Sequence, residues 1–261
     1  MDLAQHLAFV SSNPLDWAWP EVFGFCVFIF LMQGVMAFLI NVCFSPVSEI
    51  PIKQKAGDNP KEKKYIVKVL EEFETIDHVF IMFNKLVTTV FTYQVYAFAW
   101  NSSNVEWDPS KLNIANTIGA MVGLYLVYDF FYTLFHRLLH VRGLYKWVHK
   151  HHHRQMAPFR GNLDAINVHP FEFVTGEYLH LLCLWVVPTH VYTILVFITF
   201  DGIFASLNHT RFNVIIPPSI FAVKAHDTHH HLPNWNFGQY LTVWDRIFGT
   251  YKDHWMDLKK E

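Results

Sequence analysis

The stretch HRLLHVRGLYKWVHKHHH, residues 136–153, carries six histidines in eighteen positions. Five of them have helical spacing, either i, i+4 or i, i+3, i+4: His136, His140, His149, His152 and His153. On a helix, residues with these spacings lie on one face. Histidine is the commonest metal ligand and also the side chain that titrates near neutral pH. The stretch therefore predicts helices that present imidazoles to a shared site.

A second stretch, HDTHHH (226–231), repeats this spacing with His226, His229 and His230. Packing or hydrogen bonding would explain any one of these histidines, but not three phased clusters, and tracts for loose metal capture lack such phasing. Because one metal ion takes about four to six ligands, eight imidazoles indicate two ions. The three cysteines form no CxxC pair, which disfavours thiolate sites. Imidazole suits iron, zinc, copper and nickel alike, so ligand chemistry alone does not choose the metal.

The composition points to a membrane protein. Apolar residues make up 52% of the 261 positions, and charged residues make up 16%, against about 25% in soluble globular proteins. The net charge of −2 gives no basic surface of the kind that binds nucleic acid.

Four apolar regions predict the transmembrane part, at about 22–44, 79–100, 112–135 and 173–207. The first three are each long enough to cross a bilayer as one helix. The fourth is too long for one span and contains Pro188, so we expect a hairpin of two short or re-entrant helices, at about 173–187 and 190–207. Between the first two regions, the polar stretch 45–78 is predicted to form an amphipathic helix on the membrane surface in its second half.

Basic residues predict the orientation in the membrane. The 45–78 stretch is rich in lysine, which places it in the cytosol. The N-terminus and the 101–111 loop then face the lumen, and the third span returns to the cytosol at His136. The segment after His136 is also basic, so two loops agree on one topology. The fold class expected is an all-α integral membrane protein. It would have about four hydrophobic helices or hairpins and a cytosolic, histidine-rich helical cap that holds a dimetal site.

Three histidine motifs and one closing motif resemble a known family. HRLLH, HKHHH and HDTHHH are similar to the HxxxH, HxxHH and HxxHH boxes of the fatty acid hydroxylase/sterol desaturase superfamily. The stretch NFGQYLTVWDRIFGTY (236–251) resembles its closing signature. The resemblance covers about residues 125–252, and the motifs look closest to methylsterol monooxygenase-like and sterol desaturase-like members.

The resemblance implies an enzyme of the endoplasmic reticulum membrane, with the histidine boxes and the C-terminus in the cytosol. It would be a non-haem di-iron monooxygenase that hydroxylates, or desaturates, a sterol or another long-chain lipid. It would use O2 and electrons from cytochrome b5 or an NAD(P)H reductase chain. Residues 112–261 would form the catalytic domain and residues 1–111 the N-terminal transmembrane helices and a cytosolic amphipathic linker, in one integrated fold.

By motif, the resemblance implies nine ligands to two iron ions. Eight belong to the boxes, and the ninth, in LNHTRFN, precedes the last box by about one helix. The implied set is His136, His140, His149, His152, His153, His209, His226, His229 and His230.

Two aspartates are candidates for catalytic positioning. Asp129 lies seven residues, or two helical turns, before His136, and Asp227 lies between ligands of the third box. Metal-bound histidines usually need an acceptor for their second ring nitrogen, so each aspartate is predicted to orient a ligand imidazole.

Four further histidines keep open roles. His169 is either a ligand or the cap of a helix that starts after Pro170. His231 is the extra member of its triplet, and His180 and His190 lie in the apolar hairpin, where packing or a substrate channel would explain them.

Other functions remain as alternatives. On the same scaffold, the protein could be a sterol C-5 type desaturase or a fatty acid or sphingoid hydroxylase. A divalent metal transporter would need polar residues along its spans, and the spans hold few. A zinc hydrolase would need an HExxH-like box with its glutamate base, and the sequence has none.

Overall fold

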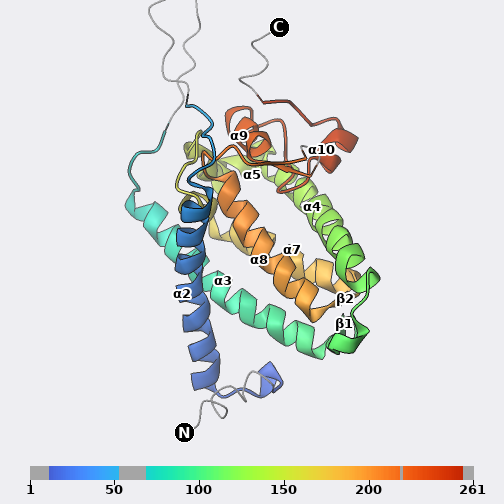
Figure 1. Ribbon diagram of the computed structural model, residues 1–261. Coiled ribbons are helices and arrows are strands. Elements are labelled where there is room, and N and C mark those ends of the chain that lie inside the picture. Colours follow the sequence, from blue (N-terminus) through green and yellow to red (C-terminus); the bar gives the residue numbers. More distant parts are fainter. Residues whose placement is uncertain (1–11, 53–68, 218–219, 255–261) are drawn as a thin grey trace, which may run out of the picture.

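The computed structural model describes residues 12–52, 69–217 and 220–254, and most of them are helical (Figure 1). The α-helices are α2 (Trp19–Phe44), α3 (Thr75–Asn101), α4 (Ala120–Leu139), α5 (Arg142–Leu144), α6 (Asn162–Ala165), α7 (Pro170–Val186), α8 (Val191–Asn208), α9 (Val223–His231) and α10 (Val243–Phe248). The 3₁₀ and π turns are η2 (Pro14–Asp16), η3 (Pro109–Lys111), η4 (Ala115–Gly119), η5 (Tyr145–His149) and η6 (His152–Arg154).

Three helices are long and apolar enough to cross a membrane. They are α2, α4 together with the π turn η4, and α8. In the apolar window of α2 only 6% of the residues are buried within the protein, as expected for a helix that lies at the lipid-facing edge. These findings confirm the predicted helical fold with membrane-spanning segments. Helix α3 contains the predicted second span but is not among these three, because Asn84, Lys85 and Gln94 make it less apolar; it packs against α2 and α7.

The predicted hairpin at Pro188 is present. Helix α7 ends at Val186 and α8 begins at Val191. Proline has no N–H to continue a helix, and it disfavours helical backbone at the residue before it. Val187 is accordingly extended, with φ −104° and ψ 110°. The linking residues form β2 (Thr189–His190), which pairs in parallel with β1 (Val105–Glu106).

Two small sheets and a set of apolar contacts complete the fold. The second sheet is antiparallel, between β3 (Ile215–Ile216) and β4 (Phe221–Ala222). Where α4, α7 and α8 meet, Leu124, Leu184 and Phe197 have no exposed surface. Each such side chain contributes about 1.5–3 kcal/mol when it leaves water, and within lipid the same residues act through close packing.

The structure differs from the predicted surface helix between the first two spans. Residues 69–74 of that segment form no helix, residues 75–78 begin α3, and residues 53–68 lie outside the described part of the chain. Leu70 and Phe73 instead contact the loop before α6. Leu70 N–H donates to Gln155 Oε1 at 2.9 Å, and the Arg160 guanidinium stacks 4.2 Å from the centre of the Phe73 ring. These tertiary contacts hold the segment against the protein.

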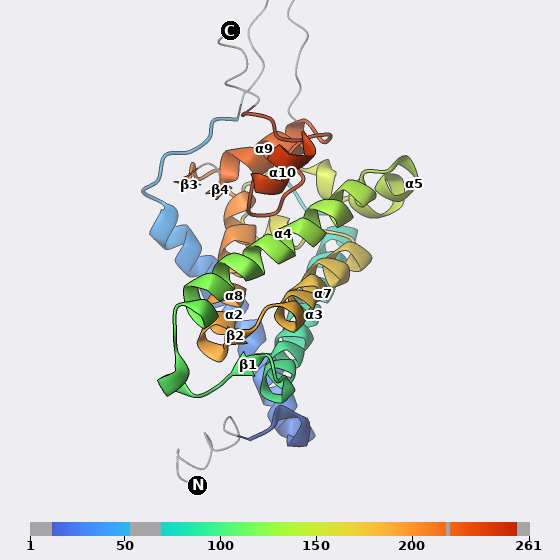
Figure 2. The ribbon, with the colours of Figure 1, turned by 90° about the vertical axis from the view of Figure 1, so that its right-hand side faces the viewer.

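The helices alternate in direction, which brings distant residues to one end of the bundle. Figures 1 and 2 show α2, α4 and α8 running toward the end covered by α9 and α10, whereas α3 and α7 run away from it. The C-terminal ends of α4 and α8 and the N-terminal ends of α3 and α7 therefore share this end.

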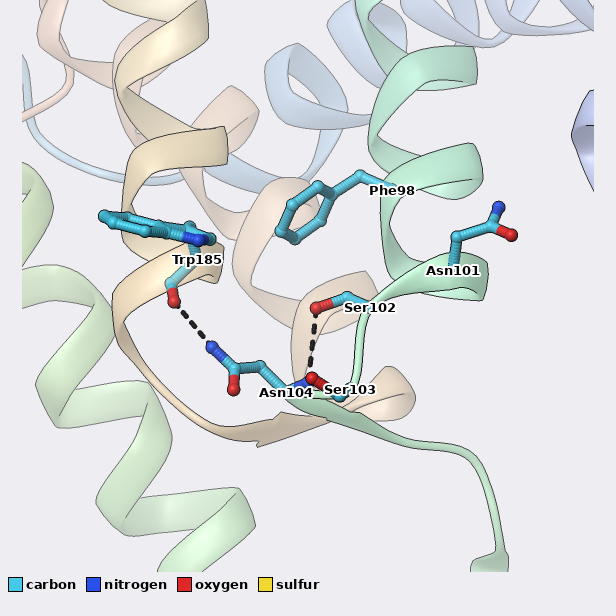
Figure 3. A pocket seen from close by; sticks show the side chains of 6 residues that line it. All are labelled: Phe98, Asn101, Ser102, Ser103, Asn104 and Trp185. Atoms are coloured by element: carbon cyan, nitrogen blue, oxygen red, sulfur yellow. Dashed lines mark hydrogen bonds between the residues drawn. The ribbon is translucent and has the colours of Figure 1, made fainter.

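The opposite end of the bundle carries β1, β2 and a shallow pocket. Figure 3 shows the side chains that line it: Phe98, Asn101, Ser102, Ser103, Asn104 and Trp185. None of the predicted site residues lies among them.

Candidate metal centre

The nine histidines predicted as ligands form two groups at the end of the bundle covered by α9. One group contains His136, His140, His149, His153 and His229, and the other contains His152, His209, His226 and His230. Within each group, one ring nitrogen from every member lies within 4.8 Å of the others. No other described residue belongs to a group of this kind.

Four segments bring these side chains together. His136 lies in the last turn of α4 and His140 caps that helix. His209 caps α8, and α9 carries the three histidines of the last box. Figures 1 and 2 show these helix ends meeting beneath α9.

The second histidine box is split between the two groups. The spacing predicts one shared helical face, but His149 and His153 lie in the first group and His152 lies in the second. The reason is local geometry: the π turn η5 ends at His149, and the 3₁₀ turn η6 begins at His152. A π turn is wider than an α-helix and a 3₁₀ turn is tighter, so consecutive side chains point to different centres.

The ring nitrogens approach one another closely in both groups. In the first group, His149 Nε2 lies 3.0 Å from His136 Nε2 and 3.0 Å from His153 Nε2. His229 Nε2 is also 3.0 Å from His153 Nε2. In the second group, the Nε2–Nε2 distances are 3.2 Å for His209–His152, 3.1 Å for His226–His209 and 3.1 Å for His230–His226.

Backbone carbonyls fix the tautomer of several of these rings. His136 Nδ1 lies 2.8 Å from the carbonyl oxygen of Phe237, and His229 Nδ1 lies 2.7 Å from that of Trp235. His209 Nδ1 lies 2.8 Å from the Ala205 carbonyl. A carbonyl only accepts, so each Nδ1 carries the proton, and a neutral ring then has a lone pair on Nε2. The Nε2 lone pairs therefore point into the two groups.

This arrangement fits metal ions. An imidazole nitrogen lies about 2.1 Å from a divalent transition metal, so two nitrogens at a right angle on one ion are about 3.0 Å apart. The observed distances match that separation. A metal-binding imidazole typically donates a hydrogen bond from its other ring N–H to a carbonyl or carboxylate. The donor set suits iron and does not by itself exclude other first-row metals.

The histidines outside the spans are held in the neutral form. Burial, together with the neighbouring His149, lowers the pKa of His140 to about 3, and burial lowers the pKa of His149 to about 3. Burial, followed by the charges of other histidines, also lowers the pKa of His152, His153, His226, His229 and His230 well below the usual value. Neutral imidazole is the form that binds a metal.

Glu172 is a site residue that the sequence analysis did not assign. Its Oε1 lies 2.7 Å from His149 Nδ1, and its side chain is buried in the first turn of α7. In its carboxylate form it accepts the Nδ1–H hydrogen bond and directs His149 Nε2 toward the first group. The motif HPFE contained the available signal, an acid close to the start of a helix.

Asp129 acts at one remove from the imidazoles. Its buried carboxylate accepts hydrogen bonds from the backbone N–H groups of Gln239, Tyr240 and Leu241, at 3.2, 3.0 and 2.6 Å. These residues follow Phe237, whose carbonyl fixes the His136 ring. Instead of contacting a ligand imidazole, as we had predicted, Asp129 holds the loop that orients one.

Asp227 also binds groups other than the ligands. Its carboxylate pairs with the Arg211 guanidinium and lies 2.9 Å from His254 Nε2. Its backbone carbonyl accepts from His231 Nδ1 at 2.8 Å, so His231 belongs to this cluster and to neither metal group. The Arg211 Nε donates to the Ile50 carbonyl at 3.1 Å. Asp227 thus connects α9 to the N-terminal part of the chain.

The remaining histidines have structural partners. His169 caps α7, where its Nδ1 accepts from the Phe171 N–H at 3.2 Å, so the cap is the alternative that the structure supports. His190 caps α8 in the same way through the Tyr192 N–H at 3.2 Å. His180 lies inside the bundle, with its Nε2 2.9 Å from Asp201 Oδ2.

Comparison with known proteins agrees with these motifs. A family model described as "Fatty acid hydroxylase" matches residues 121–250, the segment that carries all nine histidines. The chain belongs to the fatty acid hydroxylase/sterol desaturase superfamily. No solved structure matches the chain significantly.

Several sterol-modifying enzymes are similar to the chain over about half its length. It is 32% identical over 140 residues to a Delta(7)-sterol 5(6)-desaturase of Eremothecium gossypii, covering 51% of this chain and 39% of that protein. It is 32% identical over 146 residues to methylsterol monooxygenase 1 of Rattus norvegicus, with 51% and 47% covered. For the cholesterol 25-hydroxylase-like protein 1, member 2, of Danio rerio, the identity is 31% over 156 residues, with 57% and 55% covered.

Proposed function

We propose that the protein is a membrane-bound, non-haem di-iron oxygenase. It hydroxylates, or desaturates, a sterol or another long-chain lipid with O2 and two electrons from a cytochrome b5 or NAD(P)H reductase chain. The relatives with which it shares the histidine segment are named as sterol desaturases and sterol monooxygenases, which supports a sterol as the substrate class.

One observation carries this proposal. The Nε2 atoms of His136 and His149 are 3.0 Å apart, while both Nδ1 atoms donate to other acceptors. Two lone pairs at this distance repel each other, and a cation between them removes the repulsion. In the second group, His209 Nδ1 donates to the Ala205 carbonyl and four ring nitrogens converge in the same way, so each group is suited to one ion.

The nine histidines would hold two iron ions, which when bound supply the capacity to activate O2 for oxidation of an unactivated C–H bond. The protein's own residues exclude water and orient the imidazole rings. Glu172 and the Phe237 and Trp235 carbonyls hold ring protons at Nδ1, which keeps each Nε2 free to bind. The four histidines of the second group are all buried, which keeps water from that side.

The lipid would approach the first group. His140 is partly exposed, and its Nε2 has no hydrogen-bond partner in the described part of the chain. The rings of Tyr145 and Phe237 lie 5.4 and 5.2 Å from the His140 ring, centre to centre. This aromatic wall offers an apolar surface on which a lipid carbon can rest beside the metals.

A metal transporter fits less well. Transport needs a polar path through the spans, whereas Asp129 is occupied by three backbone amides and Asp201 lies against His180. The histidines gather at one end of the bundle instead. We propose that this end lies on the cytosolic side of the endoplasmic reticulum membrane, where a soluble electron donor has access.

The function can be tested in a sterol-producing eukaryotic host. The intact chain, a His152→Ala/His153→Ala variant and a His78→Ala control would be expressed, and total lipids compared by high-resolution mass spectrometry. The double substitution at His152 and His153 removes one candidate ligand from each group. His78 is exposed and belongs to neither group. We expect a lipid that is heavier by one oxygen, or lighter by two hydrogens, with the intact chain and the control only. The same product with the double variant would contradict the proposal.

A further inference from the structure

A carboxylate outside the histidine boxes lies directly behind the second box. Asp77 is in the first turn of α3, in the N-terminal part of the chain and outside the segment that the family model matches. Its side chain has no exposed surface. We propose that Asp77 is a positioning residue of the metal centre, which fixes the ligand-bearing turn 149–154 from behind. The inference rests on the proposed metal-binding function.

Asp77 binds the turn through two residues that are not candidate ligands. Its Oδ1 lies 2.9 Å from His151 Nε2 and 3.4 Å from Arg154 Nη1. The Asn167 amide closes the cluster: its Nδ2 donates to Asp77 Oδ1 and its Oδ1 lies near His151 Nε2, both at 2.9 Å. The other oxygen, Asp77 Oδ2, accepts from the Glu74 N–H at 2.7 Å, so α3 itself fixes the carboxylate.

The turn needs an external hold because its backbone is irregular. Between His149 and Arg154 the chain leaves a π turn and enters a 3₁₀ turn, with two residues between them. Neither form is as well hydrogen-bonded as an α-helix. Yet His152 and His153, which are adjacent, must reach different metal groups. A small rotation of this turn would misdirect both rings at once.

The two residues that Asp77 binds lie on either side of two candidate ligands. His151 and Arg154 flank the pair His152–His153 and face α3, while the pair faces the metal groups. Phe80, one turn further along α3, packs its ring edge 4.8 Å from the His151 ring. The positive Arg154 compensates the buried charge of Asp77, so the contact is a charge-assisted hydrogen-bond cluster. Asp77 therefore acts on the metals through the position of two imidazoles.

The test uses the full-length protein with Co²⁺ as the probe. Release of Co²⁺ to a chelator and the visible ligand-field spectrum would be compared for the intact chain, Asp77→Asn and Glu74→Gln. Glu74 is the matched control, because it pairs with the same Arg154 from an exposed position, at 2.7 Å, and has no contact with His151 in the described structure. Exposed ion pairs contribute little.

We expect Asp77→Asn to bind Co²⁺ roughly 10–100-fold more weakly, as for other residues that orient ligands, and to shift the ligand-field bands. Glu74→Gln should match the intact chain. A lower melting temperature for Asp77→Asn with an unchanged spectrum and unchanged release would overturn the inference and leave Asp77 a purely structural residue.

A second variant covers the case in which Asp77→Asn does not fold. His151→Ala removes the gripped side chain without removing a ligand, and the same change in release and spectrum is expected. If it releases Co²⁺ like the intact chain, the inference is wrong. An intact chain that binds no Co²⁺ would count against the metal centre itself, and intact binding without lipid product would count against the proposed reaction only.

Discussion

Backbone carbonyls, more than side chains, set the direction of the candidate ligands. Phe237, Trp235 and Ala205 each fix one imidazole through Nδ1. His149 relies instead on the Glu172 carboxylate. Because a carboxylate can be substituted and a carbonyl cannot, Glu172 is the residue at which this control of direction can be tested.

We predict that Glu172→Ala lowers metal affinity by about 10–100-fold, whereas Glu172→Gln, which keeps an acceptor oxygen, has a smaller effect. Competition with a chelator at constant pH measures both. Glu106→Gln is the control, because Glu106 pairs with Lys111 at the β1 end of the bundle and belongs to neither histidine group. Equal affinity in Glu172→Ala and the intact chain would contradict the role given to Glu172.

The buried histidines predict how stability depends on pH. Burial lowers the pKa of His140 and His149 to about 3 in the folded protein, whereas an unfolded imidazole has a pKa of about 6.5. Below pH 6.5 the unfolded chain therefore binds more protons than the folded chain, so the free energy of unfolding falls as the pH falls. Well above pH 6.5 these histidines are neutral in both states, so they do not change the free energy of unfolding.

Unfolding of the metal-free protein in detergent, followed by circular dichroism between pH 7.5 and 4.5, measures this dependence. Bound metal should also be released over the same range, because protons compete for the ligand nitrogens. Stability that stays constant or rises from pH 6.5 to 4.5 would show that the histidines are not buried in the neutral form.

The convergence of single histidines was predictable where local spacing carried the signal. The helical phasing of the boxes selected His136 and His229, and the family motif added His209; all three lie in the two groups. Asp129 was selected by the same phasing, but its partners are amides more than 100 positions away in the sequence. No local pattern encodes such a contact, so its role was misjudged.

The loop between α9 and α10 shows how an element serves the site. Asn236 adopts a left-handed backbone, with φ 55°, and its side chain binds the Ala225 and Lys252 carbonyls at 3.1 and 2.9 Å. Asp245 accepts from the Phe237 N–H at 2.9 Å. The NFG motif is thus explained by the need to hold the Phe237 carbonyl against His136.

We predict that Gly238→Ala disrupts this loop. A Cβ at Gly238 would lie 2.5 Å from the Leu241 carbonyl oxygen and 3.1 Å from Asp245 Oδ2. The loop must shift, which costs about 1–3 kcal/mol of stability, and the Phe237 carbonyl moves away from His136. Thermal unfolding and metal content measure the two effects.

Gly143→Ala is the matched control for this substitution. Gly143 lies in α5, and a Cβ there would meet no atom within 4 Å. Alanine also favours helix over glycine, so metal content should be unchanged and stability equal or slightly higher. A Gly238→Ala protein that keeps both its stability and its metal would refute the explanation of the motif.

Elements were predictable where composition or proline marks them. The apolar runs gave α2, α4 and the α7–α8 hairpin, with its break at Pro188. The helix expected on the membrane surface is absent from residues 69–74, where the Leu70 backbone and the Phe73 ring contact the loop around Arg160. Amphipathic spacing cannot distinguish a membrane surface from a protein surface.

At the scale of the whole molecule, alternating helix directions collect the site at one end. Residues 49–51 and 70–77 both contact the histidine segments, through Arg211 and through Arg154. The N-terminal helices therefore contribute to the site region as well as to the membrane part. This mutual arrangement depends on pairings between distant segments, which the sequence does not display.

The distribution of basic residues predicts how the whole molecule is oriented in the membrane. The lysine-rich segment 53–68 and the C-terminus should lie on the cytosolic side, together with the histidines, and the 101–111 loop should lie in the lumen. Epitopes placed in each position would be probed with antibodies in sealed microsomes. Access to the first two before permeabilisation, and to the third only afterwards, is expected. The reverse pattern would place the histidines in the lumen, away from a cytosolic electron donor.

Iron content per chain is the most direct test of whether each histidine group holds one iron ion. Full-length protein purified anaerobically after growth with iron would be analysed by inductively coupled plasma mass spectrometry, with His209→Ala and His140→Ala as variants that each lose a ligand from one group. We predict about two iron ions per chain in the intact protein, from the two groups of converging nitrogens, and weaker retention of one ion in each variant. An intact, folded protein that holds no metal, or a single ion affected equally by both variants, would contradict it.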